Sequence, residues 1–233
     1  MSLKIESSPK TIIKWVAISV FLVALIIFFV RIAVWEDAYY REKEGSEREQ
    51  AIVNIEENTE EELVEIAPTS DEIREYVVGA QRPRYLSIAK LNIKNARILP
   101  MGVNAKGELK TPNNIFDVGW YEASYAPGEG GTMVIDGHNG GPHVHGVFKD
   151  LPDLQVGDII KIERGDGKIF NYSVVENKSV LLIDADAYMS VAMRSPEKSK
   201  ESVTLISCTG EWSQVQGTYL SRQFTRAVLV STE

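Results

Sequence analysis

The stretch I-I-K-I-E-R-G-D-G-K-I-F-N-Y-S-V-V, residues 159–175, decides the fold class. Two apolar-rich runs flank Gly165-Asp166-Gly167, and glycine beside aspartate suits the tight turn of a β-hairpin. The segment therefore predicts two antiparallel strands, Ile159–Arg164 and Lys168–Val175. Closely spaced strands with few helical segments predict a mainly β domain, either a small barrel or a sandwich. Further strands are expected at Leu86–Ile88, Ala96–Leu99, Thr132–Ile135, Val203–Ser207 and Phe224–Val230, and one short helix within Asp186–Arg194.

The charge of the chain changes in two steps and divides it into three segments. Residues 1–35 carry four basic side chains and one acidic one, whereas residues 36–82 carry five basic and fifteen acidic ones. Residues 83–233 are nearly balanced, with sixteen basic and seventeen acidic side chains. Shifts of this kind indicate domain boundaries. We therefore expect a tail and anchor at 1–35, a stalk at 36–82 and the β domain at 83–233.

The first segment contains an uncharged apolar run, Trp15–Val30, that predicts a transmembrane helix. A helix over this run is about 24 Å long, and extension to Ile12 and Trp35 reaches the ~30 Å of a bilayer core. Three lysines precede the run, and Glu36 and Asp37 follow it. The positive-inside rule then predicts a single-pass plasma-membrane protein with a cytoplasmic N-terminus and an extracellular β domain. A cleaved signal peptide is the competing interpretation, but no small-x-small cleavage site follows the run.

The second segment, residues 36–82, is rich in Glu and poor in aromatic residues, which is typical of a solvated stalk. Near its end, Thr69 or Ser70 can cap a helix whose first turn is acidic. We expect this acidic extracellular stalk to contain one short helix that ends at about Val78.

Composition excludes several classes of function. A net charge of −8 and a pI near 5.1 argue against nucleic acid as the main partner, because phosphate binding needs a basic surface. A single cysteine excludes an internal disulfide framework and a cysteine-rich metal site. With only three histidines, the chain has few candidate ligands for a His-based metal site.

Two residues of the β domain have the chemistry of a covalent catalyst. Cys208 follows the strand Val203–Ser207. A lone cysteine is often only a small buried apolar residue, but in an oxidising compartment an unpaired thiol favours a functional role for the residue. His138 follows the buried strand Thr132–Ile135 in the sequence D-G-H-N-G-G, either as a solvated turn residue or as a general acid and base. Because a thiol needs a base and its leaving group needs a proton, Cys with His suits acyl transfer.

Two arginines near the last strand offer a cation for a developing oxyanion. Arg222 and Arg226 share a face if one strand contains both, but they then lie about 13 Å apart at ~3.3 Å per residue. Only one of them can reach a given carbonyl oxygen, and the other is expected to be a solvated charge.

These residues lie in segments that resemble the sortase signature. Gly137-His138 follows a strand, T-L-I-S-C ends at Cys208, 70 residues after His138, and R-A-V-L-V begins at Arg226 on the closing strand. Asp136 departs from the pattern, which usually has a small or apolar residue before Gly-His. Further segments resemble the family: P-R-Y-L-S-I-A-K-L (83–91), F-K-D-L (148–151), L-Q-V-G-D (154–158), and V-G-W-Y (118–121) with Pro127-Gly128, which is similar to class F sortases.

The resemblance implies a closed eight-stranded β-barrel, preceded by a single transmembrane helix and an acidic stalk, and a membrane-anchored cysteine transpeptidase. Cys208 would be the nucleophile that attacks an L-P-x-T-G-like sorting motif, and His138 the general acid and base. Arg226 would position the substrate and stabilise the oxyanion, since the R-x-V-x-V match favours it over Arg222. The implied partners are surface proteins that carry the sorting motif, an amine of the cell-wall precursor, and the plasma membrane.

His143 and His145 form a separate candidate. Histidines at alternate positions of a loop can hold a metal together with a carboxylate. A solvated Gly- and Pro-rich loop beside His138 is the favoured interpretation, so we expect neither a metal nor another cofactor.

Other functions stay open. A cysteine hydrolase or endopeptidase would use the same residues but pass the acyl group to water. A catalytically inactive, tethered binding barrel would no longer need His138, Cys208 and an arginine, which are all present. A stalked interaction protein would use its acidic segment instead. An L,D-transpeptidase is disfavoured because its compact S-H-G-C motif is absent from the sequence.

Overall fold

A computed structural model describes residues 63–105, 107–141 and 143–233, all within one compact unit, residues 61–233. The predicted transmembrane run and most of the predicted stalk lie outside these residues. In the part of the chain that is described, no helix has the length and apolar character needed to cross a bilayer. The elements in chain order are α2 (Ser70–Glu75), β1 (Pro83–Ile88), η1 (Ala89–Leu91), β2 (Ile93–Met101), β3 (Val118–Tyr121), β4 (Thr132–Gly137), η2 (Leu151–Asp153), β5 (Ile159–Arg164), β6 (Ile169–Leu181), α3 (Leu182–Ala192), β7 (Ser202–Ser213) and β8 (Thr218–Thr232).

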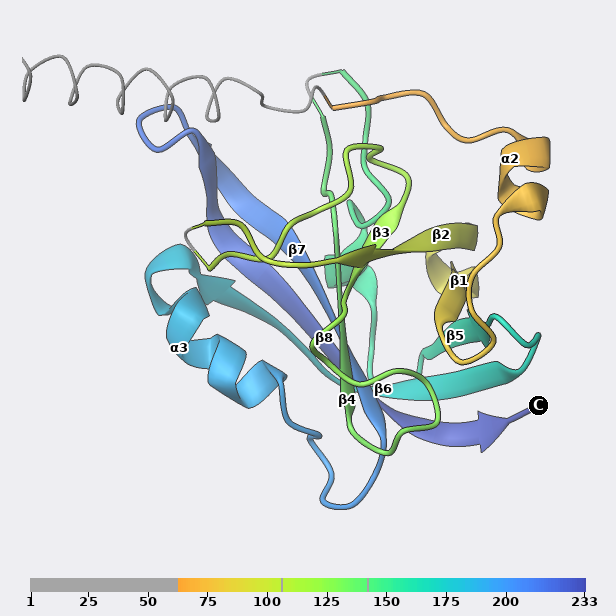
Figure 1. The fold of residues 1–233 in the computed structure, drawn as a ribbon. Helices are drawn as coiled ribbons and strands as arrows, with labels where there is room; N and C mark the ends of the chain where they lie inside the picture. Colours follow the sequence, from red (N-terminus) through yellow and green to blue (C-terminus); the bar gives the residue numbers. More distant parts are fainter. Residues whose placement is uncertain (1–62, 106, 142) are drawn as a thin grey trace, which may run out of the picture. The chain divides into compact units, whose positions relative to one another are not determined.

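The eight strands close into a barrel in the order β1-β2-β3-β4-β7-β8-β6-β5 (Figure 1). Two neighbouring pairs, β2 with β3 and β4 with β7, are parallel. The other pairs are antiparallel, among them β7 with β8 and β8 with β6. Because the barrel is closed, each strand has a hydrogen-bonded neighbouring strand on both sides. The mainly β class and the closed eight-stranded barrel expected from the sequence are confirmed.

The hairpin expected at residues 159–175 is present as β5 and β6. In its turn, Gly167 has a φ of 84°, and the Asp166 carboxylate accepts hydrogen bonds from the Arg164 guanidinium and the Lys168 backbone N–H. β6 continues to Leu181 instead of ending at Val175, because it pairs with β8 over this added length. Its polar stretch E-N-K-S is held in the strand by this pairing.

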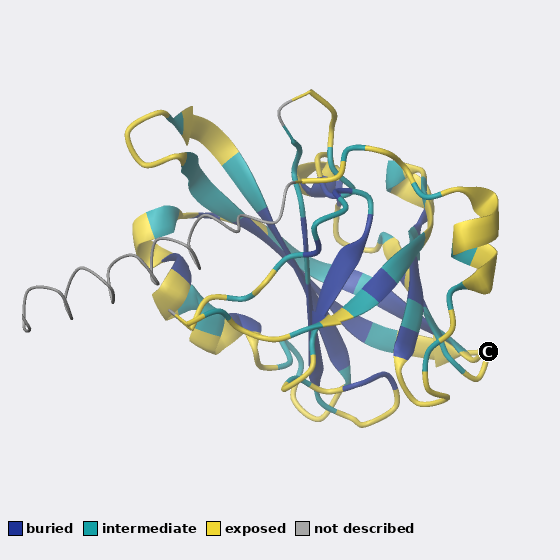
Figure 2. Ribbon diagram, turned by 45° about the horizontal axis from the view of Figure 1, so that its top comes forward, coloured by how far each residue is buried: buried dark blue, intermediate teal, exposed yellow. Residues whose placement is uncertain are grey.

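Large apolar side chains fill the barrel interior. Figure 2 shows that the buried residues are concentrated along the strands, whereas most of α2 and many loop residues are exposed. Tyr172 is fully buried there, and its hydroxyl donates to the Glu201 carboxylate over 2.6 Å. This packed interior gives the strands around it a fixed register. The interior cluster includes Leu86, Ile98, Ile135, Ile160, Ile162 and Leu205.

Helix α3 covers part of the outer surface of the barrel and buries a second apolar cluster. Val134, Ile206 and Phe224 belong to this cluster, and the Tyr188 ring meets the Phe224 ring edge-on at 4.8 Å between centroids. The sequence predicts this helix, but it begins at Leu182 and ends at Ala192, earlier at both ends than expected. Packing against the strands therefore decides its bounds.

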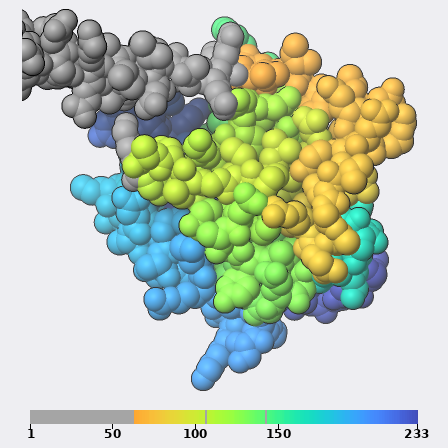
Figure 3. Space-filling view, in the orientation of Figure 1, coloured from red at the N-terminus to blue at the C-terminus, as the bar shows by residue number. Residues whose placement is uncertain are grey.

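The segment from residue 63 to β1 lies along the barrel surface (orange in Figure 3). Thr69, one of the two residues expected to cap this helix, is the N-cap of α2, and it forms a capping box with Glu72. The helix ends at Glu75, before the predicted end at about Val78. The hydroxyl of Tyr76 donates to the Ile98 carbonyl of β2 over 2.5 Å.

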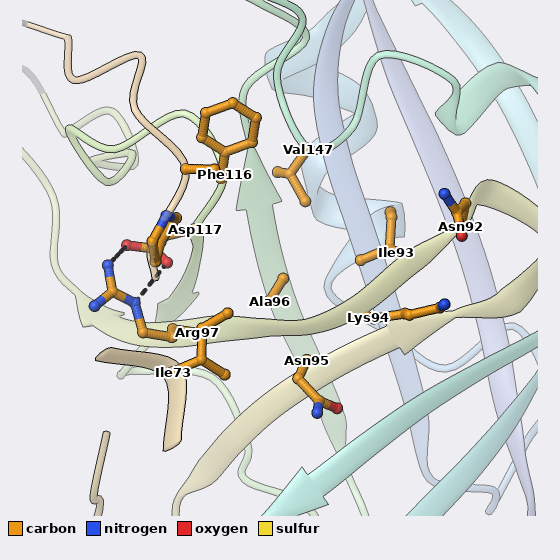
Figure 4. Close-up of a pocket in the computed structure, with 12 residues that line it drawn as sticks. Ile73, Asn92, Ile93, Lys94, Asn95, Ala96, Arg97, Phe116, Asp117 and Val147 are labelled. Carbon is orange, nitrogen blue, oxygen red and sulfur yellow. Dashed lines mark hydrogen bonds and ion pairs between the residues drawn. The ribbon is translucent and has the colours of Figure 1, made fainter. Parts of the chain in front are cut away.

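A pocket of about 240 Å³ lies between this segment and β2 (Figure 4). Arg97 donates to both carboxylate oxygens of Asp117 at its rim, over 2.9 and 2.7 Å, and Asp117 is 1% exposed. His138, Cys208 and the two candidate arginines do not line this pocket, so the catalytic candidates lie elsewhere.

Candidate active site

Three adjacent strands bring His138, Cys208 and Arg222 together. β4 and β7 run parallel, and their pairing extends to Asp136 opposite Ile206. His138 and Cys208 each lie two residues beyond this pair, so continuation of the same register puts them next to each other on one face. On the other side of β7, Cys208 is paired directly with Arg222 of β8. The result is a row of an imidazole, a thiol and a guanidinium across neighbouring strands.

The thiol of Cys208 is partly buried. Burial raises its pKa, because an apolar environment disfavours the thiolate. The Arg222 guanidinium opposes this effect and lowers the pKa, whereas the Asp136 carboxyl raises it further. Arg222 is therefore the cation whose charge acts on this sulfur.

His138 follows the last residue of β4 and is held by two contacts. Its Nε2–H donates to the Pro112 carbonyl over 2.8 Å, and its own carbonyl accepts from the Phe148 backbone N–H over 2.9 Å. Burial lowers the pKa of the His138 imidazole, and the bond to Pro112 partly offsets that effect. Beside it, Ser207 Oγ donates to the Gly137 carbonyl over 2.9 Å, which ties the end of β4 to β7. No motif of the sequence identified Pro112 as a neighbour of the histidine.

The Arg222 guanidinium is held by oxygen atoms of its own hairpin. It donates to the carbonyls of Tyr219 and Ser221 over 3.0 and 3.1 Å, and to Thr218 Oγ1 over 3.2 Å. These partners are all within four residues along β8, so this arginine fixes no distant part of the fold. Its partly buried position opposite Cys208 suits it to contact a substrate.

Arg226 lies elsewhere, and its expected place beside Cys208 is wrong. It pairs with Thr204, four residues before Cys208 on β7, which corresponds to about 13 Å along the strand. Its side chain is 7% exposed; Nη1 donates to Glu176 over 2.5 Å, and Nη2 donates to the carbonyls of Val191 and Arg194 at the end of α3. The guanidinium therefore joins β8 to β6 and α3.

The R-x-V-x-V pattern did not predict which arginine pairs with Cys208, because a sequence motif carries no information on strand register. In an antiparallel hairpin, paired residues lie at matched distances from the turn. The turn between β7 and β8, residues 214–217, places Arg222 and not Arg226 at the distance of Cys208. The location of this turn is the signal that could have identified Arg222 from the sequence.

His143 and His145 lie in an exposed loop after His138. The backbone of His145 bridges to Gly140, and the backbone N–H of His143 donates to Glu65 Oε1 over 3.1 Å. Among the residues that the structure describes, no three His, Cys, Asp or Glu side chains gather in a way that could hold a metal ion.

Together, His138, Cys208 and Arg222 have the functional groups needed for covalent acyl transfer. A thiolate at Cys208 can attack a carbonyl carbon, His138 can carry the proton, and Arg222 can donate to the oxygen on which charge develops.

A family model matches the chain over most of the barrel. The model of the sortase domain matches residues 86–230, from β1 to β8. Among curated proteins, none matches the chain.

Solved structures of several sortases are similar to the chain. A sortase D transpeptidase of Clostridium perfringens is 23% identical and covers 70% of this chain and 90% of its own, with a TM-score of 0.46. Sortase C of Streptococcus pneumoniae is 18% identical, with coverages of 72% and 75% and a TM-score of 0.49. A lid mutant of sortase A from Corynebacterium diphtheriae is 23% identical, with coverages of 69% and 76% and a TM-score of 0.48.

Proposed function

The chain belongs to the sortase family, and we propose that it is a membrane-anchored transpeptidase that uses His138, Cys208 and Arg222. One observation carries the choice of residues. The register of β4, β7 and β8 supports this choice, because its continuation brings the Cys208 thiol between the side chains of His138 and Arg222.

The first half-reaction cleaves a peptide bond. The Cys208 sulfur attacks the carbonyl carbon between Thr and Gly of an L-P-x-T-G-like sorting motif, and the carbonyl electron pair moves to oxygen. Arg222 donates an N–H to this oxyanion. When the oxyanion collapses, the C–N bond breaks, and His138 gives a proton to the departing amine nitrogen. The products are a thioester on Cys208 and a peptide with a free amino group.

The second half-reaction forms the new bond. An amine of the cell-wall precursor attacks the thioester carbon, and His138 takes the proton that this nitrogen loses. The C–S bond then breaks and releases the thiolate. The net result is the transfer of a surface protein from one amine to another.

The pKa values explain why the arrangement needs a nearby cation. Burial raises the pKa of Cys208 and lowers that of His138, so the neutral thiol and neutral imidazole are the dominant pair near pH 7. The reactive thiolate–imidazolium pair is then a minor population. Arg222 favours this population because it lowers the pKa of the thiol.

Arg222 therefore takes the role that the motif assigned to Arg226. Arg226 is bonded to Glu176 and to the end of α3, which leaves its guanidinium committed to the fold. Within the family, the chain is proposed to be class F-like, because of V-G-W-Y (118–121) and Pro127-Gly128.

The apolar run Trp15–Val30 supports an anchor in the plasma membrane with the barrel outside. Cys208 is the only cysteine, so a thiol reagent that cannot cross membranes reports on the side where the barrel lies. Intact cells that produce the chain should label at Cys208 without permeabilisation. Labelling that requires permeabilisation would place the barrel in the cytoplasm and refute this topology.

The catalytic proposal is tested with the full-length chain in a mild detergent. We would incubate it with L-P-x-T-G-like peptides, with and without a small amine, and measure the intact mass of the protein over time. We expect a thioester adduct on Cys208 that amine resolves faster than water, and no adduct on Cys208→Ala.

Each alternative function has its own outcome in this experiment. An adduct that water clears as fast as amine would identify a hydrolase. A folded protein whose thiol alkylates but never forms an adduct with any peptide would indicate an inactive binding barrel or a different substrate class.

A further inference from the structure

One dipeptide of the loop between β2 and β3 contacts two groups of the active-site region. Thr111 Oγ1 donates to Asp136 Oδ2 over 2.5 Å. The next residue, Pro112, is buried, and its carbonyl accepts from His138 Nε2–H over 2.8 Å. Asp136 and His138 are two residues apart at the end of β4 and face the same side of the strand. The carboxyl group and the imidazole are therefore connected through Thr111-Pro112.

Gly119 of β3 provides the space for this arrangement. It pairs with Asp136, and a Cβ at this position would lie 2.6 Å from Asp136 Oδ1 and 3.1 Å from Pro112 Cδ. A side chain here would also lie 2.8 Å from Met101 Cγ, so the carboxyl and the methionine would have to move. Gly119 therefore leaves room for the Asp136 carboxyl and the Pro112 ring to lie side by side against β3.

The bond to Pro112 determines which ring nitrogen of His138 carries the proton. A carbonyl oxygen only accepts hydrogen bonds, so Nε2 must be protonated whenever this bond is present. In the neutral ring, Nδ1 then has the free electron pair. In the imidazolium both nitrogens are protonated, and the Nε2–H bond to Pro112 persists.

We propose that Asp136 is a positioning residue that acts through Thr111 and Pro112 to hold His138 with Nε2 protonated, which leaves Nδ1 as the nitrogen that exchanges protons. This inference rests on the proposed transpeptidase function. Nδ1 takes the proton of the Cys208 thiol, gives it to the amine that leaves in the first half-reaction, and takes one from the amine that attacks in the second. The Nε2 proton stays in place throughout.

Asp136 also acts on the thiol through its charge. Burial raises the pKa of Asp136 to about 7, whereas the bond from Thr111 lowers it, so the carboxyl changes charge near neutral pH. The charges that act on Cys208 are Arg222 from β8, which lowers its pKa, and Asp136 from β4, which raises it. His138, the first residue after β4, carries the third titratable side chain of the proposed site. Above pH 7, ionised Asp136 therefore opposes formation of the thiolate.

Four substitutions separate the hydrogen bond from the charge. Thr111→Val removes the hydroxyl but keeps the branched shape, and Thr111→Ser keeps a hydroxyl that can bind Asp136. Asp136→Asn keeps an oxygen that accepts from Thr111 but has no charge, whereas Asp136→Ala removes both.

The tautomer is measured by NMR of ¹⁵N-labelled histidine in the full-length chain in detergent micelles. The exposed His143 and His145 are replaced by Gln, so that His138 gives the only histidine signals. We expect a protonated Nε2 and an unprotonated Nδ1 in this parent and with Thr111→Ser and Asp136→Asn, and a mixture of both tautomers with Thr111→Val and Asp136→Ala. A protonated Nδ1 in the neutral ring of the parent, or the same tautomer in all variants, would overturn the inference.

Two kinetic measurements complete the test. The rate at which iodoacetamide alkylates Cys208 is followed from pH 6 to 10, and Asp136→Asn should give a lower thiol pKa than the parent. As a matched control, the exposed Asp153→Asn should leave the profile unchanged. With a sorting peptide, Thr111→Val should lower kcat by about 10-fold, the scale of one ordinary hydrogen bond, with KM unchanged, and Thr111→Ser should restore it.

The outcomes distinguish this inference from the proposed function. An unchanged alkylation profile with Asp136→Asn, or a loss of kcat that Thr111→Ser fails to restore, would refute the role of Asp136. The NMR and alkylation measurements need no peptide. If they give the expected results while no peptide forms an adduct, the arrangement of Asp136 and His138 stands and the proposed substrate class fails.

Discussion

Replacement of Arg222 by alanine should abolish most activity without unfolding the protein. The guanidinium opposite Cys208 is the proposed oxyanion donor, and loss of one such donor typically lowers kcat by about 10²–10³. Its present partners are oxygens of Thr218, Tyr219 and Ser221 in the same hairpin. Because these contacts are local and partly exposed, the melting temperature should stay within a few degrees of the wild type, about 1 kcal/mol or less in stability.

Arg226→Met is the matched comparison, and its effect should be the reverse. It removes a nearly buried guanidinium that binds Glu176 and the carbonyls of Val191, in the last turn of α3, and Arg194, just after the helix. Loss of one charged pair and two further hydrogen bonds, discounted for the partial exposure of Glu176, costs about 3 kcal/mol. For a domain of this size, that change lowers Tm by about 6–12 °C. At a temperature where the variant is fully folded, its activity should stay within about 10-fold of wild type.

The assay combines thermal unfolding by circular dichroism with kcat/KM for a sorting peptide and an amine, measured well below both melting temperatures. Arg222→Lys serves as a further variant, since it keeps a charge but loses the planar fork of donors. If folded Arg226→Met loses about 10²-fold or more while Arg222→Ala stays active, the assignment based on register is refuted. In that case the oxyanion role returns to Arg226.

Three further changes test the surroundings of the site. Gly146→Ala would place a Cβ against the His138 carbonyl oxygen and should lower kcat/KM by about 100-fold through displacement of the histidine, whereas Gly102→Ala, with open space around it, should leave the rate unchanged. Ser207→Ala loses the bond to the β4 backbone and should lower Tm by about 2–4 °C; an unchanged Tm would show that this bond contributes nothing. Asp136→Asn should raise Tm more at pH 8 than at pH 4.5. The Asp136 carboxyl keeps its proton up to about pH 7 in the folded chain but releases it near pH 4 in the unfolded chain, so the stability of the wild type falls as the pH rises through this interval. Equal shifts in Tm at both pH values would contradict the raised pKa.

Local patterns predicted most strands but not all of their bounds. The β5–β6 hairpin was predictable because its turn residues and flanking strands are contiguous in the sequence. β3, Val118–Tyr121, was not predicted as a strand, since it is short and contains Gly119. Its pairing with β2 and β4 makes it a strand. Similarly, the far end of β6 is polar and owes its extended backbone to β8.

In the candidate site, too, some features were predictable from local sequence and others depend on strand pairing. Cys208 and His138 were predicted as catalytic residues from residue chemistry and from their places at the ends of apolar strands, and their catalytic roles stay predictions. The sequence did not predict that Arg222 pairs with Cys208, because two arginines of equal chemistry lie four residues apart on one strand and composition cannot distinguish them. The roles of Thr111 and Pro112 had no signal in the sequence, because their partners lie 25 and 26 residues away along the chain.

The sequence by itself determined the mainly β class and the two residues suited to acyl transfer, because alternation, turn chemistry and side-chain type are local properties. Only the tertiary structure decided which arginine faces the thiol and which carbonyl holds the imidazole. Those relations depend on strand register and barrel closure, and both result from the simultaneous packing of segments that are distant in the chain.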